Sequence, residues 1–330
     1  MPPAEVVVAG NVGVDTCVYP YGDEIDWSVE ANFTENLDTV GQAGGYASRG
    51  YARLGRRVAF IGHVGADHDG ELVRATLARD GVDTRALLVD PRGTARSVNF
   101  MYRDGRRKNF YDGKGHMGLA ADLALCRTVM DGARLAHVNL PNWARQLLPI
   151  ARELGLTVAC DLQDVVDPAD PYRRDFVEAA DVVFCSAANH EPERLIGELW
   201  VRRPGLLVVV GMGARGCALG AAGQVRRFPP GPDERPVVDT NGAGDGLAVG
   251  FLTSFVLEGR SLDESVRRGQ LAARHTCTLR GTSEGLITAS QLDERERMGS
   301  GFLAPGPSGP APHPVEASPE AGAEPGRKRL

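Results

Sequence analysis

The chain has 330 residues, a formal net charge of −6 at pH 7 and 42% hydrophobic residues. This length and composition allow a large α/β domain with a sizeable core, and the acidic balance argues against general nucleic-acid binding. No apolar run reaches the length of a membrane-spanning helix, and the residues before the first apolar run are too few for a signal peptide. We therefore expect a soluble, cytoplasmic protein with no membrane partner.

The cysteines are scattered along the chain, and none forms a C-x-x-C pair. Such spacing indicates neither a zinc site nor a disulfide framework. We expect buried free thiols at Cys17, Cys126, Cys160, Cys185, Cys217 and Cys277.

Short β-branched runs alternate with amphipathic segments along most of the chain. Buried strands are predicted at Val6–Ala9, Val58–Ile61, Leu135–Leu140, Leu156–Cys160, Val182–Phe184 and Leu206–Val210. Helices are predicted at Tyr46–Leu54, Gly70–Asp80, Trp143–Leu154, Pro192–Trp200, Gly246–Glu258 and Leu262–Leu279. The alternation predicts a Rossmann-like three-layer α/β sandwich with a mostly parallel sheet, and ligands bound beyond the carboxyl ends of its strands.

Two segments interrupt this alternation, at about residues 15–43 and 94–113. The first is polar and has no helical period, and the second contains Asp104-Gly105, a strong hairpin signal, between two strand-like runs. Together they predict a small β-sheet lid, although a surface hairpin without a function has the same pattern. The basic cluster of Arg103, Arg106, Arg107 and Lys108 is interpreted as a solvated hairpin tip.

The end of the chain has a different composition. Residues 297–330 are rich in Gly, Pro, Ala, Ser and Glu and contain almost no large apolar side chains. Such a segment cannot build a core, so we expect a disordered tail after one domain that covers residues 1–296.

A glycine turn precedes the predicted helix that starts at Gly246. Gly242 and Gly244 allow a tight turn, and the amide groups at a helix N-terminus favour a bound phosphate. Asp245 lies in the first helical turn, where a carboxylate can cap the helix or accept a proton from a substrate hydroxyl.

The segment Asp-Thr-Asn-Gly-Ala-Gly-Asp, residues 239–245, closely resembles the signature of the ribokinase-like (PfkB) family of sugar and nucleoside kinases. The resemblance implies a ribokinase-like fold, ATP as phosphoryl donor, Asp245 as catalytic base, and an anion hole made by Gly242, Ala243 and Gly244. It also implies that Thr240 binds nucleotide and that K⁺ can bind near Asp239.

Two further segments resemble the substrate-binding parts of the family. Asn11 and Asp15 lie in a Gly-Asn-x-x-x-Asp segment similar to that of adenosine-kinase-like members, although an Asp after a strand is also a common turn residue. Gly44 and Gly45 match the double glycine that precedes the first helix. Arg49 stands where the family usually has a substrate-binding Asn, which indicates either an acceptor with an anionic group or a side chain that points to solvent.

The metal motif Asn-x-x-Glu of the family has an incomplete match here. Glu191 fits the Glu position and would bind Mg²⁺ through water, while Ala188 replaces the Asn. The same glutamate also fits an ordinary acidic helix start before Pro192. Earlier in the chain, the segment from Gly62 to Gly70 matches a family turn in which Asp69 is predicted to cap the next helix.

The segment from Gly211 to Gly216 satisfies G-x-G-x-x-G after a strand, which raises the alternative of a dinucleotide-binding oxidoreductase. Its continuation, Cys217 to Phe228, reads as a hairpin rather than the required helix. The segment instead resembles the nucleotide loop of the kinase family, with Gly213 and Gly216 as its glycines. Gln270 begins a segment that resembles the wall of the adenine pocket.

These matches predict an ATP-dependent kinase that phosphorylates a hydroxyl, most simply a hydroxymethyl group, of a small sugar. Two alternatives stay open, namely a nucleoside kinase and a binding or regulatory protein that has lost catalysis. An exposed edge of the lid sheet would also allow a homodimer.

Overall fold

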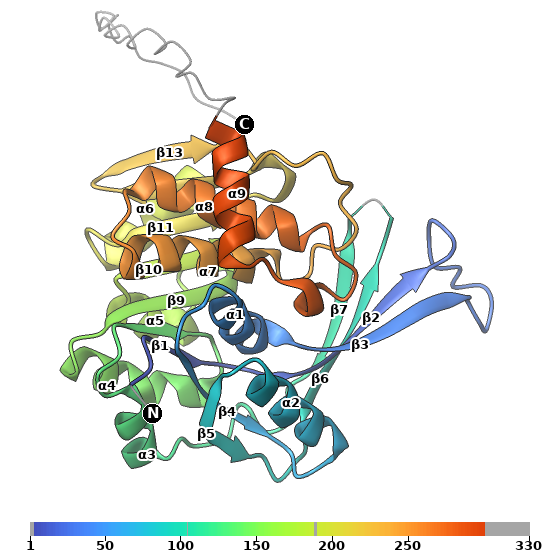
Figure 1. Ribbon diagram of the computed structural model, residues 1–330, viewed down its shortest axis with the longest axis horizontal. Coiled ribbons are helices and arrows are strands. Elements are labelled where there is room, and N and C mark those ends of the chain that lie inside the picture. Colours follow the sequence, from blue (N-terminus) through green and yellow to red (C-terminus); the bar gives the residue numbers. More distant parts are fainter. Residues whose placement is uncertain (1–2, 104, 188–189, 301–330) are drawn as a thin grey trace, which may run out of the picture.

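The computed structural model describes residues 3–103, 105–187 and 190–300. Its centre is a nine-stranded sheet in the order β13-β12-β11-β10-β9-β8-β1-β4-β5 (Figure 1). The parallel strands are β1 (Val6–Ala9), β4 (Val58–Val64), β5 (Asp83–Val89), β8 (Leu135–Val138), β9 (Thr157–Asp164), β10 (Val182–Ser186) and β11 (Leu207–Gly211). β12 (Cys217–Ala221) and β13 (Gln224–Phe228) are antiparallel.

Helices cover both faces of this sheet. One face carries α3 (Leu123–Met130), α4 (Leu148–Glu153), α5 (Arg174–Ala179) and α6 (Pro192–Arg202). The other carries α1 (Gln42–Arg53), α2 (His68–Arg79), α7 (Ala243–Leu252), α8 (Leu262–Thr276) and α9 (Ala289–Ser300). Strand alternation produces the two cores, since Val6 and Val8 face one of them while Val7 and Ala9 face the other. The predicted three-layer α/β sandwich is confirmed.

A second, four-stranded mixed sheet projects beside the central one (Figure 1). We call it the lid sheet; its strands are β2 (Gly13–Pro20), β3 (Thr34–Gly41), β6 (Ala95–Met101) and β7 (Arg107–Asp112), in the order β3-β2-β6-β7. Asp15 and Ser97 are buried and stand opposite each other on β2 and β6, whereas every residue of β7 is exposed. The predicted small sheet is therefore present, and it carries polar groups toward the interior.

Several predicted elements differ in extent. The helix predicted at Trp143–Leu154 is a 3-10 segment, Asn142–Leu147, followed by α4. The helix predicted from Gly246 begins at Ala243 and ends in a π-helical turn, Thr253–Leu257. The sequence did not predict β5, α3, α5 or α9. Of the expected tail, residues 301–330 lie outside the described residues, and α9 runs to Ser300.

The capping prediction at α2 was wrong. Asp67, not Asp69, is the N-cap, and its Oδ1 accepts a hydrogen bond from the Gly70 amide at 2.8 Å. Because the helix begins at His68, Asp69 already lies inside the first turn. Its carboxylate instead pairs with Arg96 of the lid sheet at 2.9 Å, which links α2 to β6.

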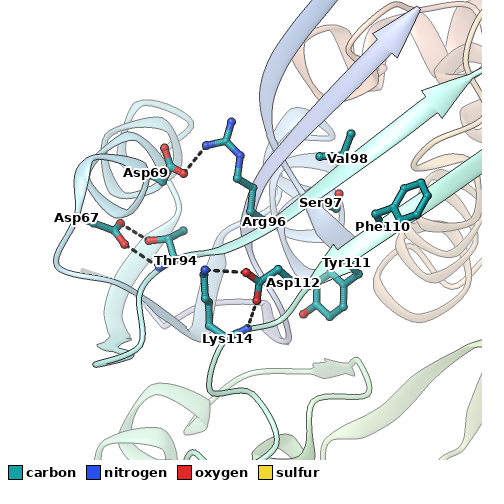
Figure 2. Close-up of a pocket in the computed structure, with 10 residues that line it drawn as sticks. All are labelled: Asp67, Asp69, Thr94, Arg96, Ser97, Val98, Phe110, Tyr111, Asp112 and Lys114. Carbon is teal, nitrogen blue, oxygen red and sulfur yellow. Dashed lines mark hydrogen bonds and ion pairs between the residues drawn. The ribbon is translucent and has the colours of Figure 1, made fainter. Parts of the chain in front are cut away.

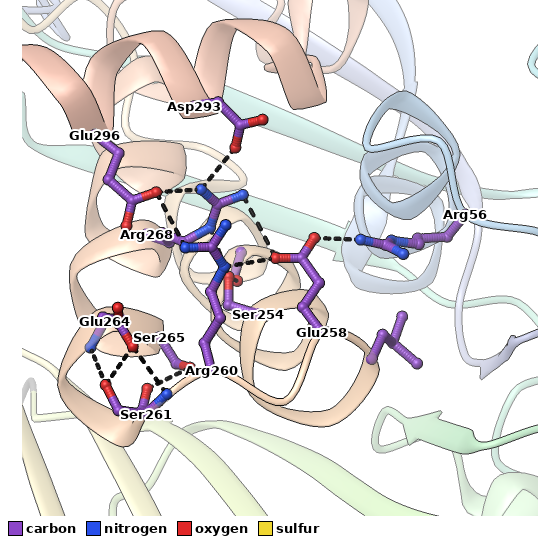
Figure 3. Close-up of polar contacts among 12 residues, drawn as sticks. Arg56, Ser254, Glu258, Arg260, Ser261, Glu264, Ser265, Arg268, Asp293 and Glu296 are labelled. Carbon is purple, nitrogen blue, oxygen red and sulfur yellow. Dashed lines mark hydrogen bonds and ion pairs between the residues drawn. The ribbon is translucent and has the colours of Figure 1, made fainter.

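A polar network fixes α9 and the end of the α7 segment to α8 (Figure 3). Arg268, only 2% exposed, donates to Ser254 and pairs with Asp293 and Glu296. Glu258 lies 3.7 Å from the same guanidinium and also pairs with Arg56. The buried Arg268 of α8 thus holds α9 and the π-helical turn after α7 in place, and all of these elements follow the predicted glycine turn in the chain. None of the helices in the described part of the chain has the length and apolar character needed to cross a bilayer.

Candidate active site

Of the two glycines predicted to form a tight turn before α7, only Gly242 lies outside the helix with a positive φ, and Gly244 lies in the first turn of α7. Gly242 is the N-cap and has φ 72°, in the left-handed region that other residues resist. A Cβ on Gly242 would lie 2.7 Å from the buried Tyr46 ring. No side chain fits at this position, so the glycine is required for the helix to start here.

Gly244 lies in a different environment. It is exposed, and apart from its chain neighbours and the adjacent backbone of its own helix no atom lies within 4 Å of the position that a Cβ would take. The space above this first helical turn is open, and free amide groups and the helix dipole at such an end favour an anion. The turn Gly242–Gly244, which we call the anion-hole turn, therefore has room for a phosphoryl group.

Asp245 follows this turn directly. The N-cap of α7 is Gly242, so Asp245 is not the capping residue. Its Oδ1 is buried and has no hydrogen-bond partner among the described residues. Burial raises its pKa well above the usual aspartate value, Asp161 and Asp15 add repulsion, and Arg107 opposes the rise. A desolvated carboxylate with an unpartnered oxygen has the properties of a general base.

Asp15 joins several elements around this carboxylate. Its Oδ1 accepts from Ser97 Oγ at 2.6 Å, and its Oδ2 accepts from the Gln42 amide at 3.1 Å and Asn241 Nδ2 at 3.2 Å. The donors come from the lid sheet, the start of α1 and the segment before α7. Burial raises the pKa of Asp15, although these bonds favour its charged form. The predicted substrate residue thus lies among the residues that surround the anion-hole turn.

Arg107 was missed as a site residue. The sequence interpretation placed it on a solvated hairpin tip, and its side chain is indeed exposed, yet Nη1 donates to Oδ1 of Asn241. Its charge lowers the pKa values of Asp15, Asp239 and Asp245. The lid sheet therefore supplies a cation next to the anion-hole turn. No local signal marks Arg107 among the neighbouring basic residues.

Unpartnered amides line the same region. Asn139 follows β8 and is 1% exposed, and both of its side-chain amide atoms lack partners among the described residues. The Gln42 carboxamide is also buried without a partner there, whereas Asn11 Nδ2 donates to the Tyr111 hydroxyl at 2.7 Å. Since buried polar groups are normally hydrogen-bonded, such amides mark space for a polar ligand. The sequence prediction placed Asn139 inside the strand Leu135–Leu140, whereas β8 ends at Val138 and leaves Asn139 directly after it.

Asp161 on β9 was also missed. Burial raises its pKa to about 6, and its Oδ1 accepts from the Gln163 amide at 2.8 Å. Its negative charge also raises the pKa of Asp245. An acidic residue at the end of the predicted strand Leu156–Cys160 lies where parallel sheets bind ligands, so its position could have indicated a role.

Gly44, Gly45 and Arg49 are all buried inside the protein. Gly44 donates its amide to the Asn11 carbonyl at 2.9 Å, and both Gly44 and Gly45 are buried in α1. The guanidinium of Arg49 is 4% exposed and binds Asp80, the Val40 carbonyl, Ser283 and Glu284. The solvent-facing alternative is therefore wrong. Because these four groups already bind the guanidinium, the structure gives no support for a contact between Arg49 and an anionic substrate.

The glycine loop after β11 leads into the β12–β13 hairpin and not into a helix. This arrangement excludes the dinucleotide-binding alternative, which requires a helix start at the pyrophosphate.

The residues predicted to bind nucleotide lie on this loop and on the segments around it. Gly213 and Gly216 have φ 58° and 88°. Gln270 Nε2 donates to Cys217 Sγ and to the Phe228 carbonyl, and Thr240 Oγ1 to the Gly105 carbonyl at 3.4 Å.

A cavity of about 500 Å³ lies between β6, β7 and the start of α2 (Figure 2). Its charged groups are largely paired with one another, as Arg96 is with Asp69 and Lys114 with Asp112. Two of its lining residues, Ser97 and Tyr111, bond to Asp15 and Asn11. The cavity thus adjoins the polar groups described above.

The model of the pfkB family of carbohydrate kinases matches residues 6–289. The chain belongs to this family. It is a carbohydrate kinase, a phosphotransferase with an alcohol group as acceptor, and kinases of this family use ATP and a divalent metal.

The relatives of this kinase include enzymes for several acceptors. The acarbose 7(IV)-phosphotransferase of an Actinoplanes species is 32% identical over 294 residues, covering 87% of this chain and 97% of the relative. The cytidine kinase of Thermococcus kodakarensis is 26% identical, covering 82% and 95%. The structure of a microbiome-derived acarbose kinase superposes with a TM-score of 0.81 at 29% identity, covering 89% and 99%.

The sequence predicts Glu191 as the residue that binds the divalent metal. The side chain is 69% exposed, precedes α6 as its N-cap and pairs with Arg227 at 3.2 Å. Ala188, the other residue of that motif, lies outside the described residues. Within the described ranges, no group of three or more His, Cys, Asp and Glu side chains could hold a metal ion. The exposed Glu191 carboxylate would help to hold an Mg²⁺ ion that keeps most of its water only after it leaves Arg227.

Proposed function

We propose that this kinase transfers the γ-phosphoryl group of ATP to a hydroxyl, most simply a hydroxymethyl group, of its acceptor, with Asp245 as the base. The observation that carries the proposal is the unpartnered, buried Oδ1 of Asp245 directly after a turn with open space over Gly244. A base beside an anion-binding turn is the arrangement that phosphoryl transfer to an alcohol needs.

In this mechanism Asp245 removes the hydroxyl proton as the oxygen attacks. Its raised pKa makes it a stronger base than an ordinary aspartate, while its side chain stays ready to accept. The amides of Gly242 and Gly244 stabilise the phosphoryl oxygens, and the Ala243 amide joins them once it leaves the Thr240 carbonyl, to which it donates at 3.3 Å. Arg107 adds positive charge near them. Mg²⁺ would neutralise nucleotide phosphates, with Glu191 as its helper through water.

We place the acceptor against Asp15, Asn11 and Asn139, with Gly44 and Gly45 as its buried floor. Asn139 offers two unused hydrogen-bonding atoms for hydroxyl groups. The adjoining cavity beside Ser97 and Tyr111 gives room for an acceptor larger than one ring. Because two relatives are named for acarbose, we include acarbose among the proposed acceptors. Arg49 is not part of the proposed acceptor site, because its guanidinium is bound to Asp80 and Glu284 inside the protein.

We place the nucleotide near Gly213, Gly216, Thr240 and Gln270. The two positive-φ glycines form a loop at the carboxyl end of β11, on the edge of the sheet where α/β folds bind ligands. Since ATP is the donor and five of the cysteines are buried free thiols, we propose that the kinase works in the cytoplasm.

We also propose a homodimer through the lid sheet. β7 is an edge strand, and Phe110 on it is 52% exposed and packs against Phe100. Light scattering after gel filtration should give twice the chain mass, and Phe110→Lys should give the monomer. A monomeric native protein would contradict this part of the proposal.

A nucleoside kinase is the second candidate, because the segment from Gly10 to Asp15 has the adenosine-kinase-like form and a cytidine kinase is among the relatives. The test is ADP release from ATP and Mg²⁺ with monosaccharides, acarbose, other oligosaccharides and nucleosides. Turnover with sugars, lost in Asp245→Asn, supports the proposal. Turnover confined to nucleosides favours the second candidate, and ATP binding without turnover favours the regulatory alternative.

A further inference from the structure

The Tyr19 hydroxyl joins three distant parts of the chain. It donates to Asp239 Oδ2 at 2.6 Å and accepts from the Gly281 amide at 2.9 Å. Tyr19 belongs to the lid strand β2, and Asp239 and Gly281 lie before α7 and after α8. Tyr19 and Asp239 are 5% and 0% exposed. This buried contact is one of the direct links from the lid sheet to the segment that carries the anion-hole turn, beside those that Asp15 and Arg107 make to Asn241.

Asp239 shapes that segment. Its Oδ1 accepts from the Asn241 amide at 2.7 Å, so the carboxylate holds the backbone that leads into Gly242. The Val238 and Asp239 amides donate to the Cys277 carbonyl at 2.8 and 3.3 Å. Loss of the hydrogen bond to Oδ2 of Asp239 would therefore disturb the backbone that leads into Gly242, where the phosphoryl group would bind.

The resemblance to ribokinase-like kinases implies a monovalent cation near Asp239, but the residues here do not fit one. A cation needs carboxylate oxygens that it can approach directly, whereas each oxygen of the fully buried Asp239 already faces a donor hydrogen, the Tyr19 O–H at Oδ2 and the Asn241 N–H at Oδ1. The Gly281 amide also points its N–H toward the same hydroxyl. In addition, the Arg280 guanidinium lies over the Tyr19 ring, 4.9 Å from its centroid, and pairs with Glu35. Donor hydrogens thus occupy the positions around the Asp239 carboxylate that a cation would require.

We propose that Tyr19 takes the place of the monovalent cation. It is a positioning residue that ties the lid sheet to the anion-hole turn through Asp239, and the kinase works without K⁺. The inference rests on the proposed phosphoryl transfer, because the group that Tyr19 positions is the anion hole.

The first experiment compares turnover in KCl with turnover in tetramethylammonium chloride at equal ionic strength. Native turnover should agree within about twofold between the salts, whereas Tyr19→Phe should lower kcat about tenfold or more and leave the KM for ATP within about threefold. K⁺ should restore part of the variant's turnover, because an Asp239 oxygen is then free. Tyr21→Phe, which alters a 63% exposed neighbour, should behave as the native protein does.

A second measurement separates this inference from the kinase assignment, because it needs no substrate. The thermal midpoint of the native protein should be equal in the two salts, and that of Tyr19→Phe should be higher in KCl. If no acceptor is phosphorylated, the proposed function fails while this comparison still reports on the cation. Activation of the native kinase by K⁺ about tenfold, a K⁺-dependent native midpoint, or native kinetics in Tyr19→Phe would each overturn the inference.

Discussion

Arg107 on β7 donates a hydrogen bond from Nη1 to Oδ1 of Asn241, the residue directly before the anion-hole turn. Asn241 in turn donates Nδ2 to Asp15 and to the Tyr46 hydroxyl. The lid sheet is thus connected to the proposed catalytic turn by an exposed cation as well as by the buried Tyr19. The Arg107–Asn241 and Tyr19–Asp239 contacts lead to different predictions, because Arg107 acts mainly through its charge and Tyr19 through a buried hydrogen bond.

Removing the charge of Arg107 should move the pH dependence of the kinase. Asp245 must be unprotonated to act as a base, and Arg107 lowers its pKa. In Arg107→Met that pKa rises, so the acidic limb of kcat/KM should shift to higher pH, and turnover at pH 7 should fall about tenfold. Arg107→Lys keeps the charge and should keep the limb near its native position.

The measurement is kcat/KM against pH for the native kinase, both Arg107 variants and Lys108→Met, which alters an exposed neighbour on the same strand. An acidic limb that is identical in Arg107→Met and the native kinase would rule out this electrostatic role.

The two glycines of the turn should respond differently to alanine. Gly242→Ala forces φ 72° on a residue with a Cβ that would lie 2.7 Å from Tyr46, so we expect a loss of stability of about 2 kcal/mol. Gly244→Ala meets no atom within 4 Å, so it should keep the native stability. Its methyl group enters the space reserved for the phosphoryl group, and kcat should fall about 100-fold.

Thermal unfolding and steady-state kinetics on the two glycine variants provide the check. A stable Gly244→Ala variant with full turnover would show that the space above α7 is not the phosphoryl site.

Asn139 should affect acceptor binding and not stability. Its buried amide has no partner among the described residues, so Asn139→Leu removes an unsatisfied polar group and should leave the free energy of unfolding unchanged or slightly higher. The KM for the acceptor should rise about tenfold while the KM for ATP stays the same, since a hydrogen-bonding partner of the acceptor is lost. Denaturant unfolding and kinetics with each substrate varied provide the measurement. Reduced stability with an unchanged acceptor KM would indicate a structural role instead.

The Arg268 network should matter for stability alone. Arg268→Met removes the buried guanidinium that Glu258, Asp293 and Glu296 share, and because these carboxylates are 22%, 55% and 25% exposed we expect a loss of about 1–2 kcal/mol. Arg267→Met, on the exposed face of the same helix, is the matched control and should change little. Thermal unfolding of both variants, with kcat measured below the transition, checks this. Equal stability of the two variants would contradict the role given to the network.

The parts of this fold that depend on local pattern were predictable from the sequence. The glycine turn before α7, the hairpin after Gly216 and the buried strands follow from backbone freedom and periodicity. Contacts between distant segments were not predictable in the same way. Arg49 and Glu284 are 235 residues apart, and nothing near Arg49 in the sequence indicates that its charge is used inside the protein.

The same limit applies to the candidate site. Arg107 belongs to a run of basic residues that looks like ordinary solvated surface, and only the pairing of β6 with β7 brings it to Asn241. Asp161 and Asn139 are different, because Asp161 directly follows the predicted strand Leu156–Cys160 and Asn139 belongs to the last two residues of the predicted strand Leu135–Leu140, both toward the carboxyl edge of the sheet. That position alone could have predicted their part in the site.

The most direct test of the central claim is the effect of Asp245→Asn on turnover and on ATP binding. The account predicts that kcat with the best acceptor falls about 1,000-fold, while the Kd for ATP, measured by calorimetry, changes less than about threefold. This result would show that the carboxylate acts in the chemical step and not in nucleotide binding. A variant that keeps turnover within about tenfold of the native rate would contradict the assignment of Asp245 as the base.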